Sequence, residues 1–154
     1  MEQTRTEPNR MDTNNPKALR QLGRADTFAA HAGIKIIHSS PDLGIATMAL
    51  TPEQRNGMGT AHGGVLFTLA DMAFAATVYP RGVYWVNAQT SITYLTPGKN
   101  APLRAESRPV RVGKSTATFE VRVLDSADTL VAIALITGHN TRVPIPDPPE
   151  EQAR

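Results

Sequence analysis

A single carboxylate stands inside an apolar stretch of the sequence. Between Val65 and Tyr79 the only clearly polar side chains are those of Thr68, Asp71 and Thr77. A helix over this stretch would be apolar on nearly every side, which is typical of a helix enclosed by protein. Because an unpartnered buried carboxylate is costly, the protein must pair Asp71, keep it protonated or use it in catalysis. The alternative interpretation is a structural carboxylate that accepts hydrogen bonds from hydroxyls such as that of Thr68.

The sequence His62-Gly63-Gly64 stands directly before this helix. A helix that begins here presents unpaired backbone N–H groups at its positive end, and two glycines let a ligand approach that backbone closely. Such an end can polarise a carbonyl oxygen. Further along, small and polar residues at spacings of four, three and four form one stripe, which predicts open space in front of the carboxylate: Gly64, Thr68, Asp71 and Ala75.

Helix geometry limits how these two features can cooperate. Gly63 and Asp71 are eight residues apart, so at about 1.5 Å per residue the carboxylate lies ~12 Å along the axis from the helix start. Groups that act on one carbonyl must approach it to about 3 Å. The amide end of one copy would therefore have to work with the acid of another copy. A C2 dimer would form two such sites.

Composition excludes several classes of chemistry. The 154 residues, 40% of them hydrophobic and 19% charged, suit one soluble domain. The chain has no cysteine, no metal-ligand spacing among its four histidines and no Gly-x-Ser-x-Gly elbow, so we expect no thiolate nucleophile, no metal and no serine hydrolase. Apolar stretches are too short to span a bilayer, the N-terminus lacks the apolar core of a signal peptide, and the net charge of +2 is dispersed. We therefore expect a cytoplasmic protein that binds neither membrane nor nucleic acid.

Periodicity predicts an α+β fold, with one long buried helix against five or six mostly antiparallel strands. A leading helix is expected over residues 16–32 and a hairpin or strand edge over 34–50, before the central helix that ends near Tyr79. Later strands are expected at 83–95, 103–112, 117–123 and 129–137. The second of these should carry a bulge or lie at an edge near Pro109, and the last should be covered on both faces.

Three segments follow from this pattern. We expect a mobile N-terminal arm at residues 1–15 and a single domain at 16–143. The Pro-rich tail at 144–154 is expected to be disordered, because its prolines cannot extend a sheet.

Several of these motifs together resemble the signature of a known family. Asn56-Gly57, then His62-Gly63-Gly64, then Leu69 to Ala75 are similar to the signature of the hotdog-fold acyl-CoA thioesterases of the phenylacetic-acid-degradation (PaaI-like) group. The resemblance covers roughly residues 33–143. It includes the strand end at 94–97 and the turn at 113–115.

The resemblance implies a sheet wrapped around the central helix, dimers that pair into tetramers, and metal-free hydrolysis of an acyl-CoA thioester. Asp71 would be the general base or the nucleophile, and the Gly63 N–H of the other subunit would be the oxyanion donor. Asn56 would help to place water or the thioester, and His62 would support the loop. No cofactor is implied, since coenzyme A is part of the substrate, whose acyl group would be small or medium, an aryl-acetyl group included.

Five further residues are expected to contact the substrate: Gly64, Thr68, Gln89, Lys114 and Ser115. Gly64 and Thr68 belong to the stripe on the central helix, and Gln89 lies in the strand that follows it. Lys114 is one of the cations that could hold the phosphates of coenzyme A. The other basic side chains on the strands have a plainer interpretation as a solvated face.

Other interpretations stay open at this point. Asn56-Gly57 is also an ordinary turn dipeptide, and His62 could simply cap the helix. A hydratase or dehydratase of the same fold would usually need a histidine paired with an acid, and His62 lies at the wrong end of the helix from Asp71 of its own chain. In a non-catalytic acyl-CoA binding module, Asp71 would be dispensable.

Overall fold

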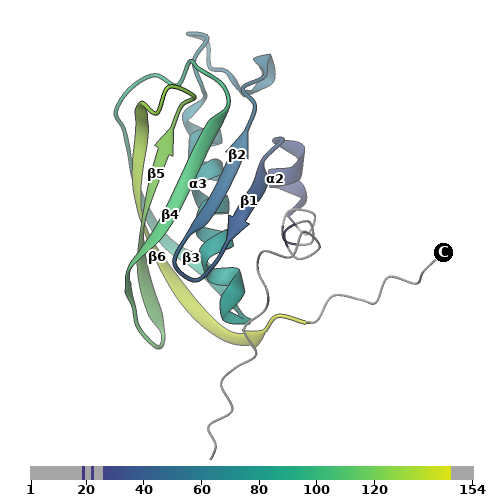
Figure 1. Cartoon of the computed structure of the whole chain (residues 1–154), viewed down its shortest axis with the longest axis vertical. Coiled ribbons are helices and arrows are strands. Elements are labelled where there is room, and N and C mark those ends of the chain that lie inside the picture. Colours follow the sequence, from purple (N-terminus) through teal and green to yellow (C-terminus); the bar gives the residue numbers. More distant parts are fainter. Residues whose placement is uncertain (1–18, 20–21, 23–25, 147–154) are drawn as a thin grey trace, which may run out of the picture.

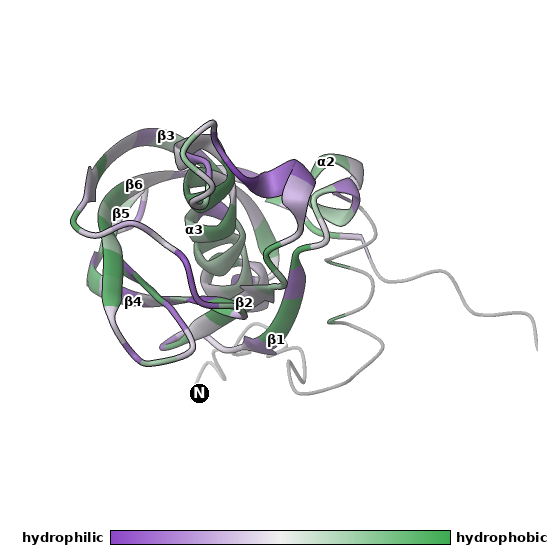
Figure 2. Ribbon diagram, turned by 90° about the horizontal axis from the view of Figure 1, so that it is seen from above, coloured by the Kyte–Doolittle hydropathy of each residue, from purple (hydrophilic) through white to green (hydrophobic). Residues whose placement is uncertain are grey.

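One long helix lies inside a curled antiparallel sheet. The structure, a computed structural model, describes residues 19, 22 and 26–146. Helix α3 (Gly63–Val78) runs along the inner face of a six-stranded sheet (Figure 1), and the view from above shows the sheet curving around it (Figure 2). The strand order is β1-β2-β4-β5-β6-β3. This arrangement confirms the predicted α+β class and its long buried helix.

Most strands follow the predicted segments closely, but the last runs seven residues past its predicted end at residue 137. Their bounds are β1 (Lys35–Ser39), β2 (Gly44–Met48), β3 (Val83–Tyr94), β4 (Leu103–Val112), β5 (Thr116–Leu124) and β6 (Leu130–Pro144). The pairing register of β4 with β5 shifts between Pro109 and Arg111, which is the predicted bulge. The edge alternative also holds locally, because β2 pairs with β4 only as far as Ser107 and leaves Pro109 beside β5 alone.

Two predicted ends differ in the structure. A single helix over 16–32 is wrong, because Asp26 has an extended backbone and its carboxylate caps a separate short helix, α2 (Thr27–His31). Strand β6 extends to Pro144, which pairs with Val83, and the Ile145 N–H donates to the Gly82 carbonyl. The packed structure thus continues past the expected boundary at 143. The expected arm at 1–15 and residues 147–154 of the expected tail lie outside the described residues.

The core forms between α3 and the inner face of the sheet. Phe74 of α3 contacts Phe119 of β5 edge to face, with ring centroids 5.2 Å apart. The expectation that every apolar stretch is too short to span a bilayer is wrong for residues 63–81, which are long and apolar enough by length and composition. However, 61% of their most apolar window is buried inside the fold, as in a core helix. The outer face of β6 is less covered than predicted, since Leu135 is half-exposed.

One side of α3 is not covered by its own sheet. Its residues are intermediate or exposed at the predicted stripe and at Phe67, whereas the remaining sides are mostly buried. The stripe lies toward Asn87 of β3, which pairs only with β6 and so is an edge strand. The helix is therefore enclosed on every side except the one that carries Asp71.

Close packing of α3 on β2 gives the first prediction. A Cβ on Gly44 would collide with the carbonyl oxygen of Ala73 and with Thr77 of the helix. We expect Gly44→Ala to destabilise the fold by at least ~2 kcal/mol, measured by urea unfolding. Gly57→Ala is the matched control, because a Cβ there meets nothing within 4 Å. Equal stability of the two variants would show that the helix does not depend on this close approach.

Candidate active site

The start of α3 leaves one backbone donor free. His62 is the N-cap, and its Nδ1 accepts a hydrogen bond from the Gly64 N–H at 3.0 Å. The N–H groups of Val65 and Leu66 donate to the His62 carbonyl. Among the described residues, the Gly63 N–H has no acceptor, so it is the donor that remains at the positive end of the helix.

Tyr94 contacts the peptide group that joins Gly63 to Gly64. Its hydroxyl donates to the Gly63 carbonyl at 2.9 Å, and a Cβ on Gly63 would lie 3.2 Å from the Tyr94 ring. The peptide that joins Gly63 to Gly64 is thus fixed through both its oxygen and its N–H, the latter by His62. The sequence did not single out this hydroxyl, because only the curl of the sheet brings the end of β3 to the start of α3.

Asn56 is committed to its own loop. Its Oδ1 accepts from the N–H groups of Met58 and Thr60, and its Nδ2 donates to the Thr60 hydroxyl. These bonds shape the turn that leads to the helix. Asn56, Gly63 and Tyr94 line one cavity of about 370 Å³. The structure therefore brings Asn56 and the free amide to the same space, although the Asn56 side chain serves the loop that forms one wall.

Asp71 is half-buried on the open side of α3. Its Oδ1 accepts a hydrogen bond of 2.7 Å from Nδ2 of Asn87 on β3. The Thr90 hydroxyl lies 2.7 Å from Nδ2 and 2.9 Å from Oδ1 of Asn87, and so fixes the orientation of the amide. Thr68 is not the partner of Asp71, because its hydroxyl donates to the Gly64 carbonyl.

The surroundings change how Asp71 ionises. Burial raises the pKa of Asp71 above the usual value for a carboxyl group, and the hydrogen bond from Asn87 lowers it in part. A carboxylate with a raised pKa is a better proton acceptor. Because Asn87 occupies Oδ1, the second carboxylate oxygen is the one that can face a reactant.

The free Gly63 N–H and the Asp71 carboxylate lie far apart within one chain. Helix α3 is continuous from Gly63 to Asp71, so about 1.5 Å per residue again separates them by ~12 Å. His62 is at the same distant end, with its Nδ1 already engaged, and does not pair with Asp71. This arrangement does not favour the hydratase interpretation.

The remaining expected residues lie in different places. Gly64 and Thr68 share the open stripe with Asp71. Gln89 is exposed on β3, after a register shift between Asn87 and Gln89. Lys114 and Ser115 are exposed in the β4–β5 turn, where their carbonyls accept hydrogen bonds from Asn140. These last three residues are not brought to Asp71 within one chain.

A metal site would need a cluster of side chains that could bind the ion. Within residues 19, 22 and 26–146, no group of three or more His, Asp or Glu side chains could hold a metal ion. The groups that the structure places at the site are a carboxylate, an oriented amide and a helix start.

The sequence and the fold of this chain are similar to those of known thioesterases. Residues 58–132 match the family model described as the thioesterase superfamily. The chain is 32% identical to acyl-coenzyme A thioesterase PaaI of Escherichia coli (strain K12) over 77% of this chain and 84% of that protein. The solved E. coli PaaI protein from the phenylacetic acid degradation operon superposes with a TM-score of 0.77 at 29% identity, over 82% of this chain and 93% of that one. A hypothetical thioesterase protein from Streptococcus pneumoniae TIGR4, solved with coenzyme A, gives a TM-score of 0.72 at 28% identity, over 80% and 97%.

The raised pKa of Asp71 predicts a pH-dependent stability. The proton on Asp71 stabilises the fold fully below the unfolded pKa of about 3.9, and this stabilisation is lost as the pH rises through the higher folded pKa. At pH 7 the ionised carboxylate therefore costs folding free energy. We expect Asp71→Asn to melt at a higher temperature than the wild type at pH 7, with the gap closing near pH 3.

Thermal unfolding by circular dichroism across this range measures the effect. Asp42→Asn, at an exposed position, is the control for the loss of one charge. A wild type that is more stable than Asp71→Asn at pH 7 would contradict the prediction.

Proposed function

The chain belongs to the PaaI-like, hotdog-fold acyl-CoA thioesterases of the thioesterase superfamily, and from this premise we propose which residues carry out the hydrolysis. Asp71 of one subunit and the Gly63 N–H of another act on the same thioester carbonyl. The substrate is a small or medium acyl-CoA, aryl-acetyl groups included. The products are the free acid and coenzyme A, and no metal or cofactor takes part.

The free N–H at the helix start carries the proposal. Three of the first N–H groups of α3 have acceptors, at Gly64, Val65 and Leu66, and that of Gly63 has none among the described residues. It lies beside a cavity large enough for part of a ligand. A fixed donor at the positive end of a helix suits an oxyanion, because it needs no reorganisation as negative charge develops.

Asp71 supplies the other half of the reaction. As general base it takes a proton from water while the water oxygen attacks the carbonyl carbon, and the Gly63 N–H stabilises the resulting oxyanion. The C–S bond then breaks, and the coenzyme A thiolate leaves and takes up a proton. Direct attack by Asp71 would instead form an acyl anhydride that water hydrolyses. Asn87 orients the carboxylate in either case.

A second copy of the chain completes the site. The open stripe of α3 and the unpaired edge of β3 leave apolar surface and backbone groups that a symmetric partner can cover. Two helices that run antiparallel across a C2 axis bring the start of each toward the middle of the other. We propose that these dimers pair into tetramers in the cytoplasm, with Lys114, Ser115 and Gln89 at the outer part of the coenzyme A site.

The function is tested by measuring thiol release from a panel of acyl-CoAs. We expect Asp71→Asn to lower kcat at least ~100-fold with little change in KM, because the carboxylate acts mainly in the transition state. Asp42→Asn is the control for a general effect of charge. Equal rates of coenzyme A release by the wild type and Asp71→Asn would refute the assignment and leave a binding module as the better description.

A mixed dimer tests whether the site is shared. Gly63→Pro removes the proposed donor, and Pro is tolerated at the first helical position because His62 before it is extended. Its Cβ would lie 3.2 Å from the Tyr94 ring, so that side chain has to shift slightly in this variant. Each homodimer should be nearly inactive. A dimer of one Asp71→Asn subunit and one Gly63→Pro subunit has one doubly defective and one intact site, so it should recover about half of the wild-type kcat. If both groups acted within one chain, mixing would restore nothing.

A further inference from the structure

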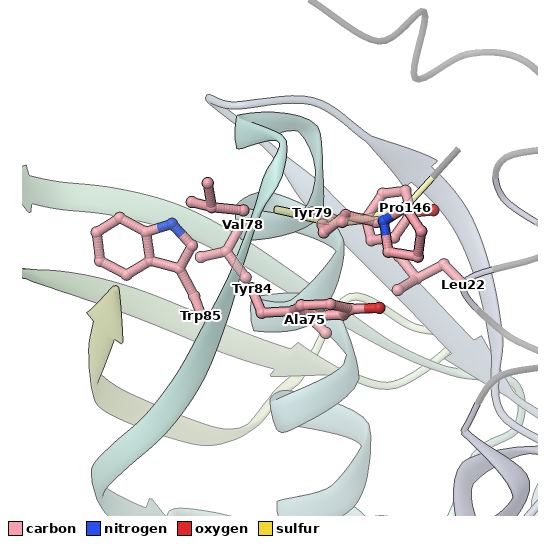
Figure 3. Close-up of a pocket in the computed structure, with 9 residues that line it drawn as sticks. Leu22, Ala75, Val78, Tyr79, Tyr84, Trp85 and Pro146 are labelled. Carbon is pink, nitrogen blue, oxygen red and sulfur yellow. The ribbon is translucent and has the colours of Figure 1, made fainter. Parts of the chain in front are cut away.

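A second cavity opens at the far end of α3, away from the helix start. It has a volume of about 210 Å³. Figure 3 shows the rings of Tyr79 and Tyr84 with Pro146 and Leu22 gathered at one side of Ala75, and Trp85 at the other. Its walls thus come from the end of α3, the start of β3, and two segments near the ends of the chain.

One lining residue of this cavity, Ala75, lies about one helical turn beyond Asp71. Ala75 is four residues after Asp71 on the same stripe, which places it about 6 Å further along the helix. Trp85 is two residues before Asn87, the partner of Asp71, and both are inward-facing positions of β3. A carbonyl held at Asp71 would therefore have the cavity on its C-terminal side along α3.

The lining favours an apolar group. Among the described residues, those that line this cavity carry no charged side chain, whereas Asn56, Thr60 and Thr96 contribute polar groups to the cavity at the helix start. A polar pantetheine arm suits the second environment better than the first. An apolar protein cavity of about 150 Å³ holds benzene, so about 210 Å³ is enough for one ring or a short chain and too small for a long fatty acyl chain.

Three of the residues that line the cavity lie outside the family-matched segment. Leu22, Ile145 and Pro146 stand before and after residues 58–132. Ile145 is 8% exposed and is fixed by the hydrogen bond from its N–H to Gly82. This part of the cavity wall thus comes from segments that flank the matched region.

We propose that this cavity binds the acyl group of the substrate and that Leu22, Ile145 and Pro146 limit that group to roughly the size of one aromatic ring. The inference rests on the proposed function, since it assigns a subsite to the same thioester. It adds that residues flanking the family-matched segment set acyl selectivity.

Two substitutions change the cavity in opposite directions. Ile145→Ala enlarges it, and we expect the ratio of kcat/KM for dodecanoyl-CoA to that for hexanoyl-CoA to rise at least tenfold. Val83→Phe fills it, and the ratio for phenylacetyl-CoA to acetyl-CoA should fall at least tenfold, since one or two carbon atoms in an apolar pocket change selectivity by about that factor. Ratios within one preparation do not depend on the fraction of folded enzyme.

Matched controls come from the same strands. Val143→Ala and Val86→Phe alter half-exposed valines on β6 and β3 that do not line the cavity, and both should leave the ratios unchanged. The inference is overturned if Ile145→Ala and Val83→Phe change all substrates by one common factor, or if the controls shift the ratios equally. If the wild type releases coenzyme A from no substrate, the proposed function has failed. Dissociation constants of the same acyl-CoAs are then measured in place of kcat/KM. The inference stands only if Ile145→Ala still shifts the ratio of these constants.

Discussion

The rigidity of one helix governs the design of this protein. Because α3 is continuous from Gly63 through Asp71, its positive end and its carboxylate remain ~12 Å apart whatever the loops around them do. Neither loop movement nor side-chain rotation can bring the free amide to the acid within a chain. Hydrolysis by these two groups therefore requires a second chain, and the open stripe of α3 is the surface through which that chain can approach.

Strand β3 supplies side chains that lie against the start, the middle and the far part of α3. Asn87 orients Asp71, Tyr94 fixes the Gly63 peptide, and Trp85 forms part of the cavity beyond the acid. All three face the helix along one strand. The free edge of this strand and the open side of α3 lie together, so the proposed assembly surface and the proposed catalytic groups occupy the same region of the molecule.

The sequence was informative where a pattern is local and regular. The spacing of apolar residues predicted α3 and five of the strand segments, and His62-Gly63-Gly64 predicted where the helix begins. Asp26 was missed as an N-cap because the apolar spacing continues across it, with Ala25 before it and Phe28 after it, and so predicted one uninterrupted helix. Pro144 was misjudged because a proline can end an edge pairing, as it does opposite Val83. The partners Asn87 and Tyr94 could not be predicted, since each depends on the register and curl of β3 against the helix.

The register shift in β3 shows why such partners escape sequence reasoning. Under strict alternation from Asn87, residue 89 would face the helix and residue 90 would face outward. The shift between Asn87 and Gln89 reverses this, so Gln89 is exposed and Thr90 is turned inward to the Asn87 amide. One extra residue in the strand thus converts Thr90 from a surface hydroxyl into the group that orients the partner of Asp71. The pKa of Asp71 depends on its burial and on the hydrogen bond from Asn87, which Thr90 orients. The β3 bulge places Thr90 there, and no periodic pattern in the sequence indicates that bulge.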